Sequence, residues 1–313
     1  MVATILLFPG QGAQKIGMGK DLADRFPVAA DLLAVVDAAL DSPITQVMWD
    51  GTEEELVATH NAQPAILAHS AAVHAVLAPR LAGRVVAAAG HSLGEYSAWM
   101  AAGALAPAQA ARLVRRRGAL MFEAGQARPG AMSAVLGLAS SEVERICQES
   151  TSAHGTVVAA NLNAPDQTVI SGDPAAVEAA GTSCTAAGAK RVLPLKVSGA
   201  FHSPLMAPAV PGLTEALRIT PFGSATFPVV ANATAELVPD ASDAAQLLAE
   251  QLTAPVRWVE SMRRLATEWP DAEWLELGPG AVLGGLLKRI VPGTNYVALG
   301  TADQIDAYLE RTA

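Results

Sequence analysis

The 313-residue chain has few cysteines, few aromatic residues and few charged ones. Its two cysteines, Cys147 and Cys184, lie in separate predicted helices without CxxC spacing, which excludes a disulfide scaffold and a cysteine-rich metal centre. This cysteine usage fits a reducing compartment, so we expect a cytoplasmic protein. Aromatic residues make up only 4% of the chain, so the core must consist of aliphatic and small side chains.

Long apolar runs and an excess of positive charge are also missing. The most apolar stretch, 97–111, is interrupted by Gly103 and Pro107, and no run reaches the length of a membrane span. The first apolar residues lead directly into a glycine-rich turn, so we predict no signal peptide. Lys and Arg number 21 against 30 Asp and Glu, giving a net charge of −9 that argues against nucleic-acid binding. We therefore expect no membrane contact and no nucleic-acid partner.

Short apolar segments alternate with helical patterns along most of the chain. Helical patterns cover 18–40, 64–77, 93–102, 107–124, 244–252, 256–267 and 282–290. The predicted strands between them are 5–8, 85–89, 227–230, 273–277 and 296–299. Strands separated by helices typically form a parallel sheet that is covered on both faces. The pattern thus predicts an α/β fold with a mostly parallel sheet.

One stretch departs from this alternation. From 128 to 197 the predicted order is strand, helix, strand, strand, helix, strand, which is the order of a ferredoxin-like unit. Turn signals flank it, with Pro129-Gly130 before the first strand and Gly199 after the last. We therefore predict a ferredoxin-like subdomain at 128–197, inserted into a larger catalytic domain formed by 1–127 and 198–313.

The strongest motif is Gly90-His91-Ser92-Leu93-Gly94, which follows a predicted buried strand and opens a predicted helix. This is the context of a G-x-S-x-G nucleophile elbow, in which the glycines allow a tight turn that exposes the serine. The turn would place Ser92 at the carboxyl edge of the sheet, with the N–H of Leu93 facing a developing oxyanion. The alternative is an accidental glycine–serine turn, which the flanking strand and helix make the weaker interpretation.

A serine nucleophile needs a base, and His202 is the best placed of the six histidines. It follows a predicted strand and the flexible Ser198-Gly199 pair, and it precedes Ser203-Pro204, a favourable N-cap and first helical residue. His91 adjoins the nucleophile, so its side chain should point away from it. The alternative for His202 is a purely structural histidine.

Arg117 lies on the apolar face of the helix predicted at 107–124. It is four residues after Leu113 and four before Met121, so the helix should direct it inward. A buried arginine needs an anion, and its planar fork suits a carboxylate. That anion is either an internal Asp or Glu or the carboxylate of a substrate, and the helix alone does not distinguish them.

A second glycine-rich turn, Pro9-Gly10-Gln11-Gly12-Ala13-Gln14, follows the first strand. It lacks the Lys-Ser/Thr pair of a P-loop and the spacing of a dinucleotide fingerprint. Because ligands gather at the carboxyl ends of parallel strands, we expect the N–H of Gln11 to complete an oxyanion hole with that of Leu93. No His, Cys, Asp or Glu set has metal-ligand spacing, so we predict no metal site.

Five segments together resemble the malonyl-CoA:acyl carrier protein transacylase family of fatty-acid synthesis and the related acyltransferases of polyketide synthases. The resemblance covers almost the whole chain. In order, the matching segments are Phe8-Pro9-Gly10-Gln11-Gly12, Gly90-His91-Ser92-Leu93-Gly94-Glu95-Tyr96-Ser97-Ala98, Arg117-Gly118, Phe201-His202-Ser203-Pro204-Leu205-Met206 and Glu276-Leu277-Gly278-Pro279-Gly280.

The resemblance implies an α/β-hydrolase-like large domain, a ferredoxin-like small one, and ping-pong transfer of malonyl from coenzyme A to the phosphopantetheine thiol of an acyl carrier protein. It implies no cofactor. In this family a backbone carbonyl usually orients the histidine, in place of a carboxylate. The implied roles are nucleophile for Ser92, base for His202, oxyanion hole for Gln11 and Leu93, carboxylate clamp for Arg117, and a glutamine near the histidine for Gln251.

Substrate choice and partners are further expectations. Phe201 beside the histidine resembles the malonyl-selective acyltransferases, because a bulky ring leaves less room for an α-methyl group. Met121 is expected to line the same acyl site. The family often has Lys after the Gly-Pro-Gly turn, where this chain has Ala281, so a contact of that lysine with coenzyme A or carrier protein is in doubt.

Several alternatives remain open from the sequence. One is a serine thioesterase or lipase, which shares the elbow but needs no inward arginine. Another is a polyketide-synthase acyltransferase with a different extender unit, and a third is a non-catalytic module that docks carrier protein. We expect a monomer with a basic docking patch for an acidic carrier protein. The candidates for this patch are Arg115, Arg116, Lys190, Arg191, Lys288 and Arg289, although solvated local ion pairs explain each of them equally well.

Overall fold

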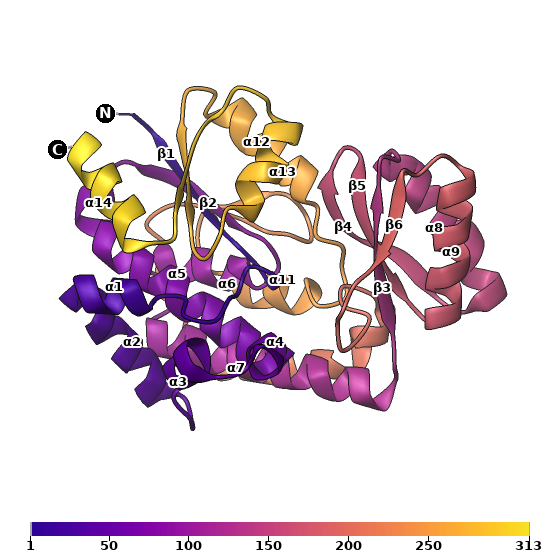
Figure 1. Ribbon diagram of the computed structural model, residues 1–313, viewed down its shortest axis with the longest axis horizontal. Helices are drawn as coiled ribbons and strands as arrows, with labels where there is room; N and C mark the ends of the chain where they lie inside the picture. The colour runs from indigo at the N-terminus through magenta and orange to yellow at the C-terminus, as the bar shows by residue number, and fades with distance from the viewer. Residues whose placement is uncertain (1, 313) are drawn as a thin grey trace.

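The computed structural model describes residues 2–312, apart from the side chains of 152–154, and contains two sheets (Figure 1). The larger sheet has the order β10-β9-β1-β2-β7-β8. Its neighbouring strands are parallel except for the antiparallel pair β7–β8, which confirms the predicted mostly parallel sheet. The strands are β1 (Thr4–Phe8), β2 (Val85–Gly90), β7 (Val229–Val230), β8 (Leu237–Val238), β9 (Glu273–Leu277) and β10 (Asn295–Leu299).

Helices cover both faces of this sheet (Figure 1). Alternate residues of β1 enter two separate cores, because successive side chains of a strand point to opposite faces. Leu6 and Phe8 pack with α5 (Thr59–Leu81), α6 (Gly94–Ala101) and α7 (Pro107–Ala127). Ile5 and Leu7 pack with α12 (Trp258–Glu268) and α13 (Val282–Ile290). The sheet is therefore buried on both sides, as its apolar strands predict.

The helical pattern predicted over 18–40 is divided in the structure. It forms α1 (Lys20–Arg25) and α2 (Pro27–Ala39), with Phe26 between them in extended conformation. The residue before a proline avoids the helical region, so Pro27 separates the two helices and begins the second. The other helices are α3 (Ile44–Asp50), α4 (Glu53–Val57), the 3₁₀ helix η1 (Pro204–Ala209), α10 (Val210–Ile219), α11 (Ala244–Glu250) and α14 (Ala302–Arg311). Within 2–312, no helix is both long and apolar enough to cross a membrane.

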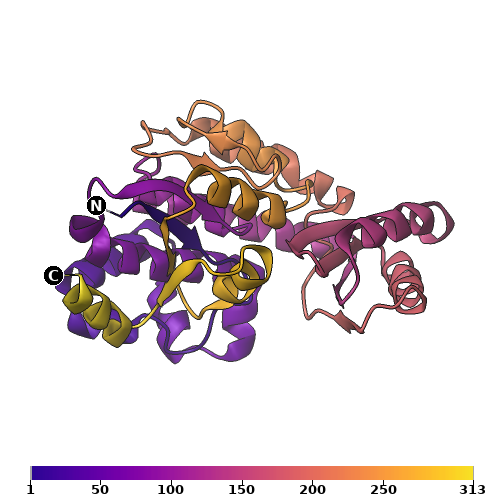
Figure 2. The same cartoon turned by 90° about the horizontal axis from the view of Figure 1, so that it is seen from above.

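The smaller sheet is antiparallel and has the order β4-β5-β3-β6. Helices α8 (Ser140–His154) and α9 (Pro174–Ala186) pack on it around a separate core. Figures 1 and 2 place this unit at the end of the molecule opposite α14. Its order confirms the ferredoxin-like prediction, while the exact domain limits at 128 and 197 remain a prediction. The strands are β3 (Ala131–Leu136), β4 (Val157–Ala164), β5 (Gln167–Gly172) and β6 (Arg191–Pro194).

The two units join along β4. The N–H of Leu162 donates to the carbonyl of Val256 at 2.9 Å, and the N–H of Val256 donates to the carbonyl of Ala160 at 2.8 Å. Val256 lies two residues before the start of α12, which also packs against β4. The β4 strand therefore fixes the small unit beside the carboxyl end of the large sheet, where the candidate site lies.

Candidate active site

Ser92 lies on the turn between β2 and α6, with a φ of 52° in the left-handed region. The two glycines of the motif allow this turn to pack tightly. A Cβ on Gly94 would lie 2.1 Å from the carbonyl oxygen of Phe8, and one on Gly90 would lie 1.8 Å from the carbonyl carbon of Gly94. Neither position has room for a side chain, so the glycines bring the serine to the carboxyl edge of the sheet, as predicted.

His202 lies beside the nucleophile, on the loop before η1. Its Nε2 is 2.7 Å from Ser92 Oγ, and its Nδ1 lies 3.0 Å from the carbonyl oxygen of Gln251 and 3.2 Å from that of Ala254. Carbonyl oxygens only accept hydrogen bonds, so these contacts favour a proton on Nδ1 and leave Nε2 free to accept one. Ser203 caps η1 by accepting from the N–H of Leu205, which holds the loop in place.

The imidazole of His202 is kept neutral by its surroundings. Burial and the nearby charge of Arg117 lower the pKa of His202 to about 3, although the two carbonyl contacts act in the opposite direction. A neutral imidazole with a free Nε2 can take a proton from Ser92 at ordinary pH. The geometry and the charge state both suit a general base.

Arg117 is buried, with 1% of its surface exposed, so α7 does direct it inward. Its Nη2 donates to Ser92 Oγ at 3.1 Å and to Gln251 Oε1 at 2.9 Å, while Nη1 donates to Gln63 Oε1 at 2.8 Å. All three partners are neutral oxygens, and the buried Nε has no partner among the described residues. The sequence left open an internal carboxylate partner, but the acceptors found here are uncharged.

Gln11 and Leu93 follow β1 and β2, so their backbones meet at the same edge of the sheet. Both residues line the cavity that contains Ser92. Neither backbone N–H donates to another backbone or side-chain group within 2–312. The two N–H groups predicted for an oxyanion hole are therefore free beside the nucleophile.

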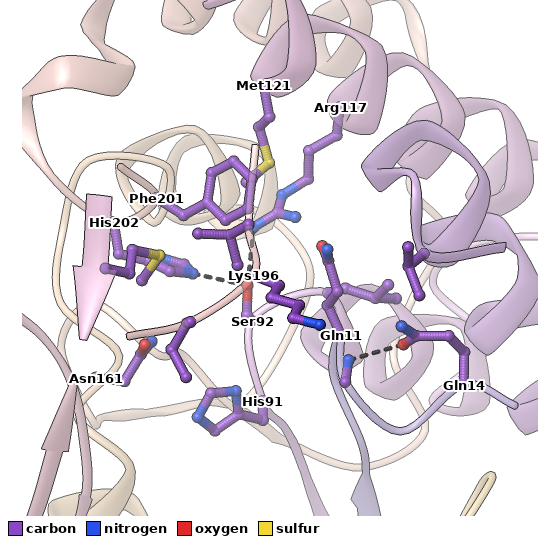
Figure 3. A pocket seen from close by; sticks show the side chains of 16 residues that line it. Gln11, Gln14, His91, Ser92, Arg117, Met121, Asn161, Lys196, Phe201 and His202 are labelled. Carbon is purple, nitrogen blue, oxygen red and sulfur yellow. Dashed lines mark hydrogen bonds between the residues drawn. The ribbon is translucent and has the colours of Figure 1, made fainter. Parts of the chain in front are cut away.

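The cavity has a volume of about 310 Å³ and lies between the two units. Figure 3 shows His202 and Arg117 directed at Ser92 from different sides, with Phe201 and Met121 nearby. Gln251 does not line this cavity, but it forms hydrogen bonds with two residues that do, Arg117 and His202. The lining residues are Gln11, Gly12, Gln14, Val57, His91, Ser92, Leu93, Arg117, Met121, Met132, Asn161, Leu195, Lys196, Val197, Phe201 and His202.

Sequence reasoning missed Asn232, which follows β7 beside the nucleophile turn. Its Oδ1 accepts from the N–H of Ser92 at 2.7 Å, and its Nδ2 donates to the carbonyl of Gly90 at 2.7 Å. A polar residue two positions after a strand that pairs with β2 is a signal that could have indicated it. Gln63 on α5 was also missed, since it lies in a mostly apolar helix. His91 points away from Ser92 as predicted, and its Nε2 lies 2.7 Å from Asn163 Oδ1.

The chain is similar in sequence to known acyltransferases over nearly all of its length. A family model described as an acyl transferase domain matches residues 5–293. The malonyl CoA-acyl carrier protein transacylase of Bacillus subtilis (strain 168) is 40% identical over 309 residues, covering 97% of this chain and 95% of that protein. The protein of that name from Escherichia coli (strain K12) is 40% identical over 311 residues, covering 99% and 100%.

Solved structures agree with this likeness. A type II PKS acyl-carrier protein in complex with its malonyl-transacylase includes a chain that is 41% identical, with a TM-score of 0.93 and 99% of both chains covered. The malonyl-CoA:acyl carrier protein transacylase of Xanthomonas oryzae pv. oryzae is 36% identical, with a TM-score of 0.94, covering 99% of this chain and 98% of that one. The likeness therefore includes both units of the fold.

Proposed function

Because the chain belongs to the acyl transferase domain family, we propose that it transfers malonyl from malonyl-CoA to the phosphopantetheine thiol of an acyl carrier protein. The names of its relatives support this reaction. The observation that carries the proposal is the position of Ser92 Oγ, which lies within hydrogen-bond distance of both His202 Nε2 and Arg117 Nη2. A nucleophile, a base and a buried cation thus meet at one atom.

The first half of the proposed reaction loads the serine. His202 Nε2 takes the proton of Ser92 as Oγ attacks the thioester carbonyl, and the oxyanion accepts from the N–H groups of Gln11 and Leu93. Donors of this kind contribute about 3–4 kcal/mol each where they have been removed. The carbon–sulfur bond then breaks, the thiol of coenzyme A leaves with the proton from His202, and malonyl remains as an ester on Ser92.

Arg117 holds the free carboxylate of malonyl in this proposal. Its Nη1 carries two N–H groups and donates one to Gln63 Oε1, so the guanidinium, which lines the cavity, keeps a donor for a guest anion. A carboxylate at this position would also offset the positive charge that lowers the pKa of His202. Substrate binding would therefore make the imidazole a stronger base at the moment when it is needed.

In the second half, the carrier protein's thiol gives its proton to His202 and attacks the ester. The tetrahedral intermediate collapses, Ser92 regains its proton, and malonyl leaves on the carrier as a thioester. Phe201 and Met121 line the cavity and limit the space beside the acyl chain. One α-methyl group is worth about 1–3 kcal/mol of discrimination, so this pocket favours malonyl over methylmalonyl.

We further propose that the protein is a cytoplasmic monomer and needs no cofactor. We also propose that it recognises an acidic carrier protein through exposed cationic side chains. Three of the candidate cations have internal partners. Arg115 donates to the carbonyl of His60 at 2.7 Å, Arg116 forms an ion pair with Glu123 at 3.9 Å, and Arg289 contacts Asp166. Lys190, Arg191 and Lys288 form no ion pair within 2–312, so they are the better candidates.

The test is to incubate the protein with malonyl-CoA, quench in acid and examine the Ser92 peptide by mass spectrometry. We expect one malonyl group on that peptide, none in Ser92→Ala, and its disappearance when holo-carrier protein is added, with malonyl-carrier as product. Rapid release of malonate without carrier protein would identify a hydrolase instead. A protein that binds carrier but shows neither adduct nor turnover would be a docking module.

A further inference from the structure

We propose that Glu95 is the positioning residue that holds Ser92, His202 and Arg117 in their reactive arrangement, an inference that rests on the acyl transfer proposed above. Glu95 lies in the first turn of α6 and has no exposed surface. Its Oε2 accepts from the backbone N–H of Asn232 at 2.9 Å and from Gln251 Nε2 at 2.7 Å. One carboxylate oxygen therefore contacts the two residues that hold the reactive groups.

The contact with Asn232 extends to the nucleophile. Fixing the backbone of Asn232 fixes its side chain, whose Oδ1 accepts from the N–H of Ser92 at 2.7 Å. Ser92 occupies the left-handed region, which costs about 1–3 kcal/mol for a residue other than glycine. The surrounding contacts must maintain this conformation, and the connection from Glu95 through Asn232 supplies one of them.

The contact with Gln251 extends to the other two groups. The side chain of Gln251 accepts from Arg117 at Oε1, and its backbone carbonyl accepts from His202 Nδ1. An ionised carboxylate only accepts, so Glu95 requires the NH₂ of Gln251 to face it and thereby turns Oε1 toward Arg117. With the amide reversed, its NH₂ would face the guanidinium and two donors would oppose each other.

The two hydrogen bonds that Glu95 Oε2 accepts do not depend on whether the carboxyl group of Glu95 is ionised, because its second oxygen, Oε1, can carry the proton. Oε1 has no hydrogen-bond partner among the described residues. Burial raises the pKa of Glu95 to about 7, against the opposing effects of its hydrogen bonds to Asn232 and Gln251 and of the charge on Arg117. His202, which contacts the carbonyl of Gln251, and Tyr96, whose pKa burial also raises, are further titratable groups at this cluster. A proton would occupy the free Oε1, so Oε2 can accept in either state.

A second buried carboxylate provides a matched control. Glu276 on β9 is also fully buried, and it accepts from the N–H groups of Leu283 at 3.2 Å and Gly284 at 2.9 Å. It fixes the start of α13, and its hydrogen-bond partners within 2–312 are Leu283, Gly284 and Tyr296, none of which is a reactive group of the site. Its removal should lower stability without changing how the protein chooses its acyl group.

The experiment measures loading of malonyl and acetyl from their coenzyme A thioesters by wild type, Glu95→Ala, Glu95→Gln, Glu95→Asp and Glu276→Ala, with thermal melting for each. In Glu95→Ala we expect malonyl loading to fall at least about 10-fold more than acetyl loading, because the carboxylate clamp is displaced as well as the base. Glu95→Gln should stay within about 3-fold of wild type in both, since its amide oxygen can replace Oε2. Glu276→Ala should melt earlier but keep the wild-type preference.

The outcomes separate this inference from the proposed function. If the wild type forms no malonyl-serine, the proposed function is wrong. If the wild type loads malonyl but folded Glu95→Ala retains its rate and preference, the positioning role is wrong. If Glu95→Ala does not fold, Glu95→Asp provides the test. The shorter side chain of Asp moves the carboxylate away from Gln251, so an unchanged preference for malonyl over acetyl would overturn the inference. A Glu95→Gln variant that loses the preference would contradict the acceptor role.

Discussion

At the scale of single residues, Arg117 is the group on which the proposed selection of the acyl group depends. Replacing it by alanine should weaken malonyl transfer by about 1.5–3 kcal/mol, or roughly 10- to 150-fold in kcat/KM, because charged hydrogen bonds to the carboxylate are lost. Transfer of acetyl should suffer much less. Steady-state kinetics with both thioesters measures the difference, and Arg117→Lys serves as a control that keeps the charge but not the fork. An equal loss for both substrates would show that Arg117 is not the clamp.

The same scale shows what the sequence alone can indicate about the site. Ser92 and Arg117 are local signals, one set by glycine spacing and the other by a helical stripe, so their placement could be predicted. For Asn232 the sequence shows only that a polar residue follows a predicted strand, and its contact with Ser92 could not be predicted because it joins segments 140 residues apart. Glu95 belongs to a recognisable motif, yet its hydrogen bonds to Asn232 and Gln251 exist only once the sheet has assembled.

At the scale of elements, the close contact of α7 with α5 positions Arg117. A Cβ on Gly118 would lie 2.7 Å from the carbonyl oxygen of Thr59 and 2.8 Å from the Cα of His60, both backbone atoms. Gly118→Ala should push the helices apart, costing about 1–3 kcal/mol of stability and raising KM for malonyl-CoA more than for acetyl-CoA. Urea unfolding and steady-state kinetics measure the two effects.

Gly285 on α13 is the matched helical glycine, since a Cβ there would meet no atom within 4 Å. Gly285→Ala should leave KM unchanged and stabilise the protein by about 0.5–1 kcal/mol, because alanine is the better helix former. If Gly118→Ala behaved like this control, the contact between the two helices would not position the arginine.

Element boundaries follow from the sequence where apolar periodicity is strong. The strand 273–277 and the helix 282–290 were predicted with the bounds that the structure gives them. Two short elements were not predicted. Helix α4 has five residues and strand β8 only two, which is too few to show a hydrophobic period in the sequence. The separation of α1 from α2 was also missed, although Pro27 was a visible signal for it.

At the scale of the whole molecule, the balance of buried titratable groups predicts acid sensitivity. Burial lowers the pKa of His69 and His74 to about 4 and that of His202 to about 3. Between pH 6.5 and 4 the unfolded chain binds protons at these positions that the folded chain does not, so stability falls as the pH falls. Glu95 and Glu276, whose pKa values burial raises, offset part of this effect.

Urea unfolding at pH 7 and at pH 5 tests this balance. Each net proton bound by the unfolded chain changes the stability by about 1.4 kcal/mol per pH unit. We expect a lower unfolding midpoint at pH 5 and a shallower pH dependence in His69→Asn. A midpoint that rises on acidification would show that the two carboxyl groups outweigh the histidines.

The overall architecture was predictable because each layer has its own sequence period. Strand–helix alternation indicated the covered parallel sheet, and the change of order between 128 and 197 indicated the inserted antiparallel one. How the two units meet was not visible, since it depends on backbone hydrogen bonds between β4 and Val256 that carry no side-chain pattern.

The carbonyl oxygens beside His202 Nδ1 also bear on which half of the proposed reaction depends more on the base. A carbonyl has only a partial charge, so it stabilises an imidazolium less than a buried carboxylate would. A thiol, whose pKa is about 8.5, gives up its proton far more readily than water, whose pKa is about 15.7, or than the hydroxyl of Ser92. We therefore expect the modest support of the imidazolium to slow the acylation of Ser92 more than the removal of the acyl group by a pantetheine arm.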